Sequence, residues 1–444
     1  MNRMEVFDRA RSRNEARTEE RGERTGLLDF LRKKLHGEIL REGNSSVLVV
    51  REMVPWSFRH GDVVFEEVGS IDAAVLPMLF TRNFKPGLRF EELLFFDVET
   101  TGLSGGAGTK VFLTGFLRIT AEGVSVTQYF LSTLSSEPLY LRHLQEQLKK
   151  GRVLVSYNGK AYDYNLIKSR YILNGFPSGD SDPLHLDLLY SSRRLWKGHL
   201  PDFTLGTVER MAFGCARPFD IPGWQIPQVY FDYLRGRDVC SDMHLVFLHN
   251  RLDLLSLLAL LVRQATLLKA GVSGRNTIQG INPATISDML LKKGYQDEAC
   301  RILEGHPENN EAMRRLGLIK KRQKKHSQAL QLFIALADHA RGLDEYLFAC
   351  TEAAKLCEHV FRDIERALFY AANMRERLGR ARILSPESHE RFRSWEPSIE
   401  RRIVRLKSKL LLHTRKVDLA DGAGLGVVRE AETDTSDQER KSGG

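Results

Sequence analysis

The feature that most constrains the fold is residues 93–103, Leu-Leu-Phe-Phe-Asp-Val-Glu-Thr-Thr-Gly-Leu. An apolar run of this length that leads into a glycine turn is typical of a buried strand. Alternate side chains of a strand point to the same face, so Asp97 and Glu99 leave this strand together. Burying two neighbouring carboxylates is costly unless a cation lies between them, and a divalent metal is the expected cation. For this motif alone, two solvated acids at a strand end are the alternative.

Two further acids occur in segments with a helical pattern. Asp163 lies near the start of a helix predicted over 161–173, directly after a predicted strand. Asp253 interrupts the strongly apolar stretch 245–267, where a carboxylate needs a partner. His249 precedes Asp253 by one helical turn, on the same face. A salt bridge for Asp253 and an ordinary helix histidine at position 249 are the alternatives.

These four acids are predicted to be both catalytic residues and metal ligands. Carboxylate oxygens suit Mg²⁺ or Mn²⁺ rather than zinc. Two such ions about 4 Å apart can hold a scissile phosphate and activate the attacking water. His249 is a further candidate catalytic residue, a general base, because an imidazole with a pKa of about 6.5 can accept a proton at neutral pH.

The order of the predicted elements favours an α/β fold. Strands are predicted near 93–99, 111–119 and 124–131, and helix 138–150, strand 153–157 and helix 161–173 follow them. This is the order of a ribonuclease H-like domain, a mixed sheet with flanking helices. Beyond residue 282 the chain is predicted to be almost wholly helical, and Leu316, Gly317, Ala329 and Phe333 have the spacing of a tetratricopeptide-type repeat. An all-α helical-repeat domain without catalytic groups indicates a docking surface for another protein.

The chain is therefore predicted to have six parts. They are a charged N-terminal arm (1–45), lead-in strands (46–90), the ribonuclease H-like domain (91–270), a linker (271–281), a tetratricopeptide-like helical domain (282–415) and a disordered tail (416–444).

The composition of the chain indicates which class of binding partner and which cellular compartment to expect. The net charge of +9 favours a polyanionic partner. The five cysteines are widely spaced and form no Cys-x-x-Cys pair, which predicts a reduced, cytoplasmic protein without a zinc or disulfide framework. The apolar runs predict no membrane span and no signal peptide.

A basic and aromatic cluster lies at 193–197, Arg-Arg-Leu-Trp-Lys. Arg194 and Trp196 combine a charge for phosphate with a ring for stacking, which suits single-stranded nucleic acid. The alternative is that the basic residues lie on the surface and the tryptophan in the core.

The segments around the acids resemble the three exonuclease motifs of the DEDD (DnaQ-like) 3′–5′ exonucleases. The resemblance is carried by 96–102 (Phe-Asp-Val-Glu-Thr-Thr-Gly), by Asn158-Gly159 with Asp163, and by His249 with Asp253. Three further segments, 185–189, 194–209 and 220–223, are similar to the YprB-type ribonuclease H-like family, which also carries a tetratricopeptide-like C-terminal region.

The resemblance implies a metal-dependent DNA exonuclease that works from the 3′ end, on single strands or 3′ ends, in DNA repair and with a helicase as partner. It implies substrate contacts at Thr100, Gly102, Leu103, Asn158 and Lys160, and a reserve or supporting role for the acid Asp187. An RNA exonuclease of the same fold is one alternative, and a non-catalytic nucleic-acid-binding scaffold that uses the helical repeat is another.

The chain departs from the wider DEDD pattern at the histidine. In that group the general base usually stands five residues before the last aspartate, where this chain has Leu248. His249 stands at four, the usual tyrosine spacing, and one residue turns a helix by about 100°. His249 thus combines histidine chemistry with the position of the tyrosine.

Overall fold

The computed structural model describes residues 26–71, 75–80, 88–102, 108–177, 183–237, 240–272, 281–384, 390 and 392–425. The chain divides into two compact units, with the boundary between Ile302 and Leu303. The predicted linker at 271–281 lies mostly outside the described residues, and the boundary falls after it. The first helices of the predicted helical domain therefore belong to the first unit.

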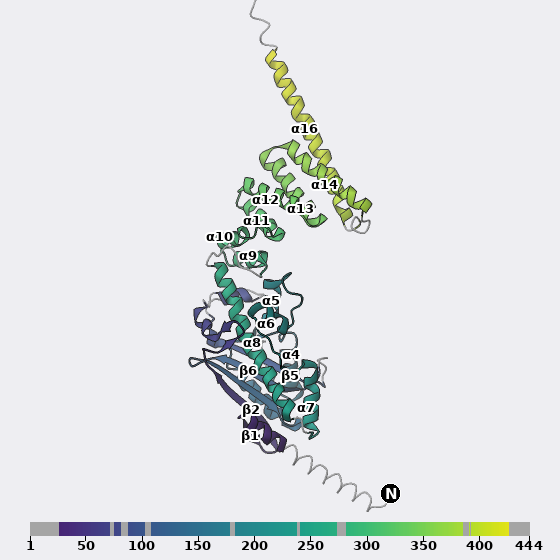
Figure 1. Cartoon of the computed structure of the whole chain (residues 1–444). Helices are drawn as coiled ribbons and strands as arrows, with labels where there is room; N and C mark the ends of the chain where they lie inside the picture. Colours follow the sequence, from purple (N-terminus) through teal and green to yellow (C-terminus); the bar gives the residue numbers. More distant parts are fainter. Residues whose placement is uncertain are drawn as a thin grey trace, which may run out of the picture. The chain divides into compact units, whose positions relative to one another are not determined.

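The first unit is built on a seven-stranded mixed sheet with the strand order β1-β2-β7-β6-β5-β8-β9 (Figure 1). Neighbouring strands from β1 to β5 are antiparallel, whereas β5, β8 and β9 are parallel. This mixed sheet with flanking helices confirms the predicted ribonuclease H-like fold. The strands are β1 (Glu38–Glu42), β2 (Ser45–Val54), β5 (Leu93–Thr100), β6 (Val111–Ile119), β7 (Val124–Leu131), β8 (Val153–Ser156) and β9 (Leu184–Asp187), and a separate pair is formed by β3 (Arg59–His60) and β4 (Val63–Val64).

Helices cover both faces of the sheet because the strands alternate between two apolar clusters. On β5, Leu93 and Phe95 pack in the cluster that includes most of helix α8, whereas Leu94 and Phe96 pack in the cluster of helix α3. The helices of this unit are α2 (Leu76–Leu79), α3 (Glu137–Leu148), α4 (Asp163–Leu173), α5 (Leu188–Trp196), α6 (Leu205–Phe213), α7 (Ile226–Leu234), α8 (Cys240–Val272), α9 (Pro283–Leu291) and α10 (Gln296–Glu304), with short 3₁₀ turns η1 (Phe65–Ser70), η3 (Phe90–Glu92), η4 (Leu134–Ser136) and η5 (Gly223–Gln225).

The N-terminal strands are part of the main sheet. Strand β2 pairs with β7 from Val47 opposite Leu131 to Val54 opposite Val124, and β1 then covers the outer edge of β2. Strand β2 thus lies in the region predicted as lead-in strands (46–90), and its buried Val47, Leu48 and Val49 add to the main core. Within the same region, the two-residue strand β4 is followed by the turn η1.

Helix α8 crosses the sheet and carries the second half of the site. By length and composition alone, residues 242–271 could span a membrane, but 67% of their most apolar stretch is buried inside the unit. The helix packs on β5 and β6 and against α5, α6 and α7. We interpret α8 as the central core helix of the first unit.

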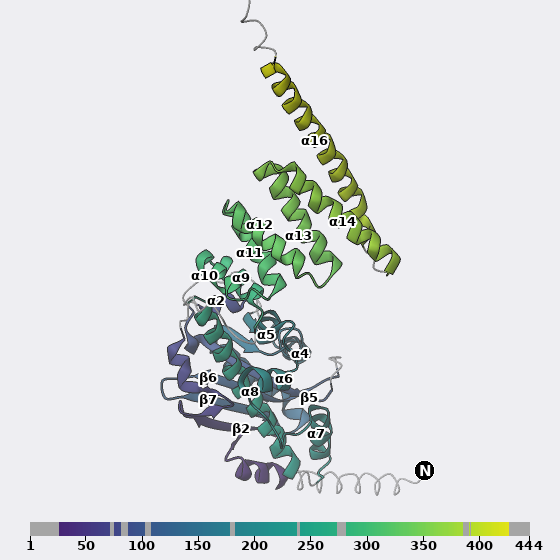
Figure 2. The same ribbon diagram turned by 45° about the horizontal axis from the view of Figure 1, so that its top comes forward.

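The second unit is a series of helices in which each packs on the next in chain order (Figure 2). An added Cβ at Gly317 would lie 2.7 Å from the ring of Phe333, so glycine lets the first two helices pack closely. The tetratricopeptide assignment stays a prediction. The elements are α11 (Asn310–Arg322), α12 (His326–Asp338), α13 (Leu343–Leu356), the π turn η6 (Cys357–Phe361), α14 (Ile364–Leu384), η7 (Arg393–Trp395) and α16 (Glu396–Leu425). Of the tail predicted to be disordered, 416–425 is helical and 426–444 lies outside the described residues.

A buried acid ties α16 to the rest of this unit. Glu358 of η6 has a fully buried side chain, and it accepts hydrogen bonds of 2.7 Å from both Arg405 and Lys409. Burial opposes ionisation, but these hydrogen bonds lower the pKa of Glu358 from 4.5 to about 2. A carboxyl whose pKa falls on folding adds stability above its unfolded pKa, and this stability is lost as the pH falls through the folded value.

We expect the helical unit to lose stability between about pH 4.5 and pH 2, and Glu358→Gln to remove most of this dependence. At neutral pH the substitution should cost about 3 kcal/mol, because the buried side chain of residue 358 loses the charge that pairs with Arg405 and Lys409. Thermal unfolding followed by circular dichroism at several pH values measures both effects. Glu311→Gln, which removes an exposed pair with Arg315, is the control and should cost under about 1 kcal/mol. An unchanged pH profile in Glu358→Gln would contradict the assignment.

Candidate active site

Asp97 and Glu99 lie at the C-terminal end of β5, on the face that α8 covers. They alternate with Val98, which packs in the opposite cluster. A register shift between Glu99 and Thr100 interrupts the pairing with β6 directly after the two acids. Both acids are therefore held on a central strand at the point where regular pairing is first disturbed.

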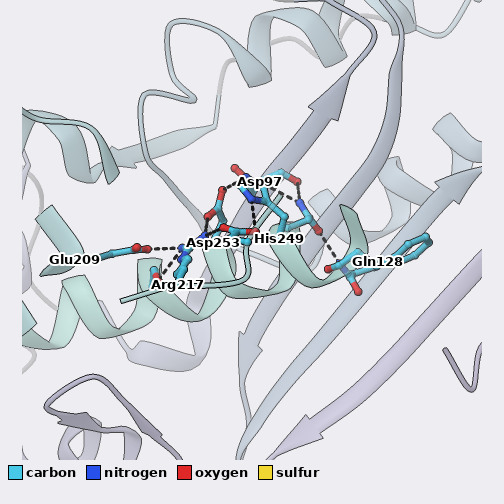
Figure 3. A network of polar contacts seen from close by, with 10 residues as sticks. Asp97, Gln128, Glu209, Arg217, His249 and Asp253 are labelled. Atoms are coloured by element: carbon cyan, nitrogen blue, oxygen red, sulfur yellow. Dashed lines mark hydrogen bonds and ion pairs between the residues drawn. The ribbon is translucent and has the colours of Figure 1, made fainter. Parts of the chain in front are cut away.

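Asn250 of α8 fixes the position of Asp97. Its Nδ2 donates to Asp97 Oδ2 at 2.8 Å and to the Asp97 carbonyl oxygen at 3.2 Å. Its Oδ1 accepts from Nε2 of Gln128 on β7 at 2.9 Å, and the same Nε2 donates to the carbonyl of Phe247 at 2.8 Å (Figure 3). Asn250 and Gln128 are buried, so this relay holds the Asp97 carboxylate in one orientation.

Gly115 allows α8 to approach the sheet this closely. It lies directly opposite Asp97 on β6. An added Cβ would lie 2.2 Å from Asn250 Oδ1 and 2.6 Å from a methyl group of Leu254. A glycine inside a strand often marks a close approach of another element, and here that element is the helix that carries Asn250.

Asp163 reaches the same region as the first residue of α4. The turn before it bends at Asn158, which has φ of 62°. The backbone N–H groups of Asn158 and Lys160 donate to Asp187 at 2.8 and 3.2 Å. Asp187 thus supports the turn, and its oxygens accept hydrogen bonds from backbone donors, which favours the supporting role over the reserve role among the two predicted for it.

The acids form a desolvated cluster of like charge. Burial raises the pKa of Asp97 well above its usual range, and the charges of Asp253, Glu99 and Asp163 raise it further. Burial likewise raises the pKa of Glu99 to about 8 and that of Asp163 to about 7. The structure therefore brings the four predicted acids together in a desolvated place where their charges repel one another.

Arg217, in the loop between α6 and α7, binds the fourth acid. Its guanidinium donates to Asp253 Oδ1 at 2.5 Å and to Asp220 Oδ2 at 3.2 Å, and it forms an ion pair with Glu209 (Figure 3). It also donates to Ser256 at 3.1 Å. The salt bridge weighed as the alternative for Asp253 is thus present, within a cluster of three carboxylates.

His249 lies between two of these carboxylates. Its Nδ1 is 2.8 Å from Asp220 Oδ1, and its Nε2 is 3.5 Å from Asp253 Oδ2. Burial opposes a charged imidazole, but the hydrogen bond to Asp220 and the charges of Asp253 and Glu99 raise the pKa of His249 to about 9. A protonated imidazole cannot accept a proton. The predicted base role therefore requires a cation among the carboxylates that lowers this pKa.

A cleft of about 690 Å³ opens beside the acids. Its lining includes Glu99 and Asp163, and also Thr100, Gly102 and Asn158, which were predicted to contact substrate. Lys160 lies exposed on the turn that forms one wall. Leu103, the remaining residue of the predicted loop contacts, lies outside the described residues.

The predicted contacts of Arg194 and Trp196 are corrected by the structure. Trp196 is only 4% exposed and packs in the main core, so its ring cannot stack on a substrate base. Arg194 donates to the carbonyl oxygens of Met78 and Leu79. For these two residues the structure favours the alternative, in which the arginine and the tryptophan have separate structural roles and do not form one binding site.

Sequence reasoning missed the residues that position the acids. Arg217, Gln128 and Gly115 are separated from the acids along the chain, and no local pattern marks them, whereas Glu209 ends the segment 194–209. Asn250 lies inside the His-Asn-x-x-Asp segment, and Asp220 begins the Asp-Ile-Pro-Gly segment. Their place in these segments was the only available signal.

The donor set fits a hard divalent cation. It consists of carboxylate oxygens that burial has stripped of water and that repel one another. Among the residues that the structure describes, however, no three acidic, histidine or cysteine side chains already converge around one ion. The two oxygens of Asp253 face Arg217 and His249. Asp253 must therefore give up at least one of these partners before it can bind a metal ion.

The comparisons with known proteins agree with this geometry. A family model described as the RNase_H superfamily matches residues 94–264, from β5 into α8. An uncharacterized protein, YprB of Bacillus subtilis (strain 168), is 30% identical over 383 residues, which cover 81% of this chain and 86% of YprB. The similarity thus extends into the helical unit.

Proposed function

The chain belongs to the same family as YprB and contains an RNase_H superfamily domain, and from this we propose that it is a metal-dependent DNA exonuclease of the DEDD type. The observation that carries the proposal is the desolvated acid cluster, in which Asp253, Glu99 and Asp163 raise the pKa of Asp97 beyond the effect of burial. Such a cluster is expected where charge is needed to hold a cation and not where it stabilises the fold.

Different residues of the chain have different roles in the proposed reaction. Asp97, Glu99, Asp163 and Asp253 would hold Mg²⁺ or Mn²⁺, and the bound cation would supply the positive charge that activates water and stabilises the leaving oxygen. Asn250 keeps Asp97 in place, and Asp220 holds the imidazole of His249 through Nδ1. This leaves Nε2 of His249 as the atom that takes the proton of the attacking water.

Separate observations support the proposed direction of cleavage, substrate, protein partner and cellular compartment. The similarity of residues 96–102 and the two later segments to the DEDD motifs supports cleavage in the 3′–5′ direction on DNA. The net charge of +9 supports a polyanionic substrate. The helical unit supports docking of a protein partner, for which we propose a helicase that supplies single strands during repair. Cys215, Cys300, Cys350 and Cys357 are buried as thiols and not as disulfides, which supports the reducing cytoplasm.

Cleavage of labelled strands tests the proposal. The full chain is incubated with 3′-labelled or 5′-labelled DNA, and in parallel with RNA, in Mg²⁺, Mn²⁺ or EDTA. We expect mononucleotides from the 3′ label and a ladder of shortened strands from the 5′ label, with DNA and only with metal. Cleavage of RNA alone would contradict the proposal that DNA is the substrate. The absence of any metal-dependent product would favour the alternative function, a non-catalytic nucleic-acid-binding scaffold.

A further inference from the structure

The proposed cation site already contains a positive charge, that of Arg217. Its guanidinium lies between Glu209 and Asp253, and only 12% of its side chain is exposed (Figure 3). The Nη1 atom donates to Asp253 Oδ1 at 2.5 Å. A guanidinium stays protonated in proteins. Asp253 is therefore paired with a permanent positive charge at the place where a divalent cation is proposed to bind.

Arg217 has three further partners that hold it beside Asp253. Its Nη2 atom forms an ion pair with Glu209, whose side chain is only 1% exposed, and donates to Ser256 Oγ at 3.1 Å. Its Nη1 atom also donates to Asp220 Oδ2 at 3.2 Å. These three contacts do not involve Asp253. They would keep the positive charge next to this acid even when the contact between the two residues is broken.

Asp253 has a basic side chain at each of its two oxygens. Besides the contact of Oδ1 with Arg217, its Oδ2 is 3.5 Å from Nε2 of His249. Asp97, by contrast, accepts its side-chain hydrogen bond from the neutral amide of Asn250. The contact of Asp253 with Arg217 is the shorter of its two contacts. Arg217 is thus the closer competitor of a cation for this carboxylate.

The charge of Arg217 opposes the binding of a divalent cation. Two positive charges that share one carboxylate repel each other, and a charge within about 4–6 Å changes the affinity of a site for a proton by about one to three pKa units. The same electrostatic energy acts on a metal ion. Glu209 reduces the effect, because its buried carboxylate compensates part of the guanidinium charge. The two members of this ion pair therefore have opposite effects on a cation at Asp253.

On the basis of the proposed nuclease function, we propose that Arg217 is a positioning residue that holds Asp253 through Oδ1 and competes with the divalent cation for this carboxylate. Glu209 limits the competition. The chain itself thereby neutralises part of the site, and the affinity for the cation is lower than the four acids alone would give. Removal of the charge of Arg217 should strengthen the binding of the cation, and removal of the charge of Glu209 should weaken it.

Binding of Mn²⁺ in the absence of nucleic acid tests the inference. The full chain is titrated with Mn²⁺ at pH 8 in a calorimeter, and its Tm is measured at increasing Mn²⁺ concentration. Neither measurement depends on cleavage. The variants are Arg217→Gln and Glu209→Gln, which break the same buried ion pair from its two sides, and Arg217→Lys, which keeps the positive charge.

We expect Arg217→Gln to bind Mn²⁺ about tenfold more tightly than wild type, and Glu209→Gln to bind it about threefold more weakly. Both variants should have a lower Tm without metal, because each leaves one member of a buried ion pair without its partner. Damage to the fold alone would weaken binding in both, so only competition predicts opposite changes. Arg217→Lys should bind like wild type. Glu358→Gln, which changes a buried acid of the helical unit, is the control and should not change the affinity.

The results that contradict this inference differ from those that contradict the proposed function. If wild type binds Mn²⁺ but Arg217→Gln binds it equally well or more weakly, or if Arg217→Lys binds as tightly as Arg217→Gln, competition by the charge of Arg217 is excluded while the proposed function stands. If Arg217→Gln does not fold, Glu209→Gln decides, and equal or tighter binding by this variant excludes the competition. If wild type shows neither heat of binding nor a change of Tm with Mn²⁺, the proposed metal-dependent function fails, and this inference fails with it.

Discussion

Asp97→Asn is expected to lower metal-dependent cleavage about 10³-fold and, at the same time, to make the metal-free protein more stable. The loss of activity follows from the proposed role of Asp97 as a metal ligand. The gain in stability follows from the crowding of charge, because Asp253, Glu99 and Asp163 all act on Asp97 in a desolvated place. Asparagine keeps the shape and can still accept the hydrogen bond from Asn250 through its oxygen.

Thermal unfolding in EDTA and in Mg²⁺ separates the two effects. In EDTA we expect Asp97→Asn to unfold a few degrees above wild type, since relief of about 1 kcal/mol shifts the Tm of a domain of this size by about 2–4 °C. Added Mg²⁺ should stabilise wild type and have little effect on the variant. Glu146→Gln, on an exposed side chain of α3, is the control and should behave like wild type. A variant that unfolds earlier than wild type in EDTA would show that Asp97 supports the fold and not a cation.

Gly115→Ala is expected to damage both the fold and the site. The added methyl group would overlap Asn250 Oδ1 at 2.2 Å and Leu254 at 2.6 Å, and both neighbours are fully buried. Overpacking of a core costs about 1–3 kcal/mol. Because α8 must move away from β6, Asn250 would lose its contact with Asp97, and we expect cleavage to fall about 10- to 100-fold, as for other residues that support metal ligands.

The control for this change is Gly206→Ala. Gly206 lies in the first turn of α6, and an added Cβ would have no neighbour within 4 Å. Alanine favours a helix more than glycine does, so this variant should be as stable as wild type or slightly more stable. The free energy of unfolding in urea and the rate of cleavage are measured for both variants. Equal stability of Gly115→Ala and wild type would mean that the helix is not in close contact with the strand.

The parts of the fold that the sequence could predict are those with a clear hydrophobic period. Strands β6 and β7 were predicted with the bounds that the structure has, because apolar residues dominate both and glycine or polar turns end them. Asp97, Glu99 and Asp253 could be predicted because they adjoin or interrupt apolar segments, where a charge is costly, and Asp163 because it follows a predicted strand at the start of a helix. Their convergence on one place follows from the ribonuclease H-like order of elements.

The rest depends on contacts between distant segments. No pattern within α5 indicates that Trp196 faces the core while Arg193 faces solvent, since a ring beside charged residues is compatible with both arrangements. The ion pair of Arg217 with Asp253 joins residues on a loop and a helix, and only the fold brings them together. The role of Gly115 could not be predicted for the same reason, because the close approach of α8 to β6 depends on how the helix packs on the sheet.

The N-terminal strands have a practical consequence for work with fragments. A fragment that begins near residue 94, where the RNase_H superfamily match starts, would lack β2. One edge of β7, from Val124 to Leu131, would then have no hydrogen-bonding partner, while β6 still pairs with the other edge. Such a bare, apolar edge recruits strands from other molecules and leads to aggregation. A fragment that contains the first unit should therefore include residues 26–54, so that β2 covers the edge of β7.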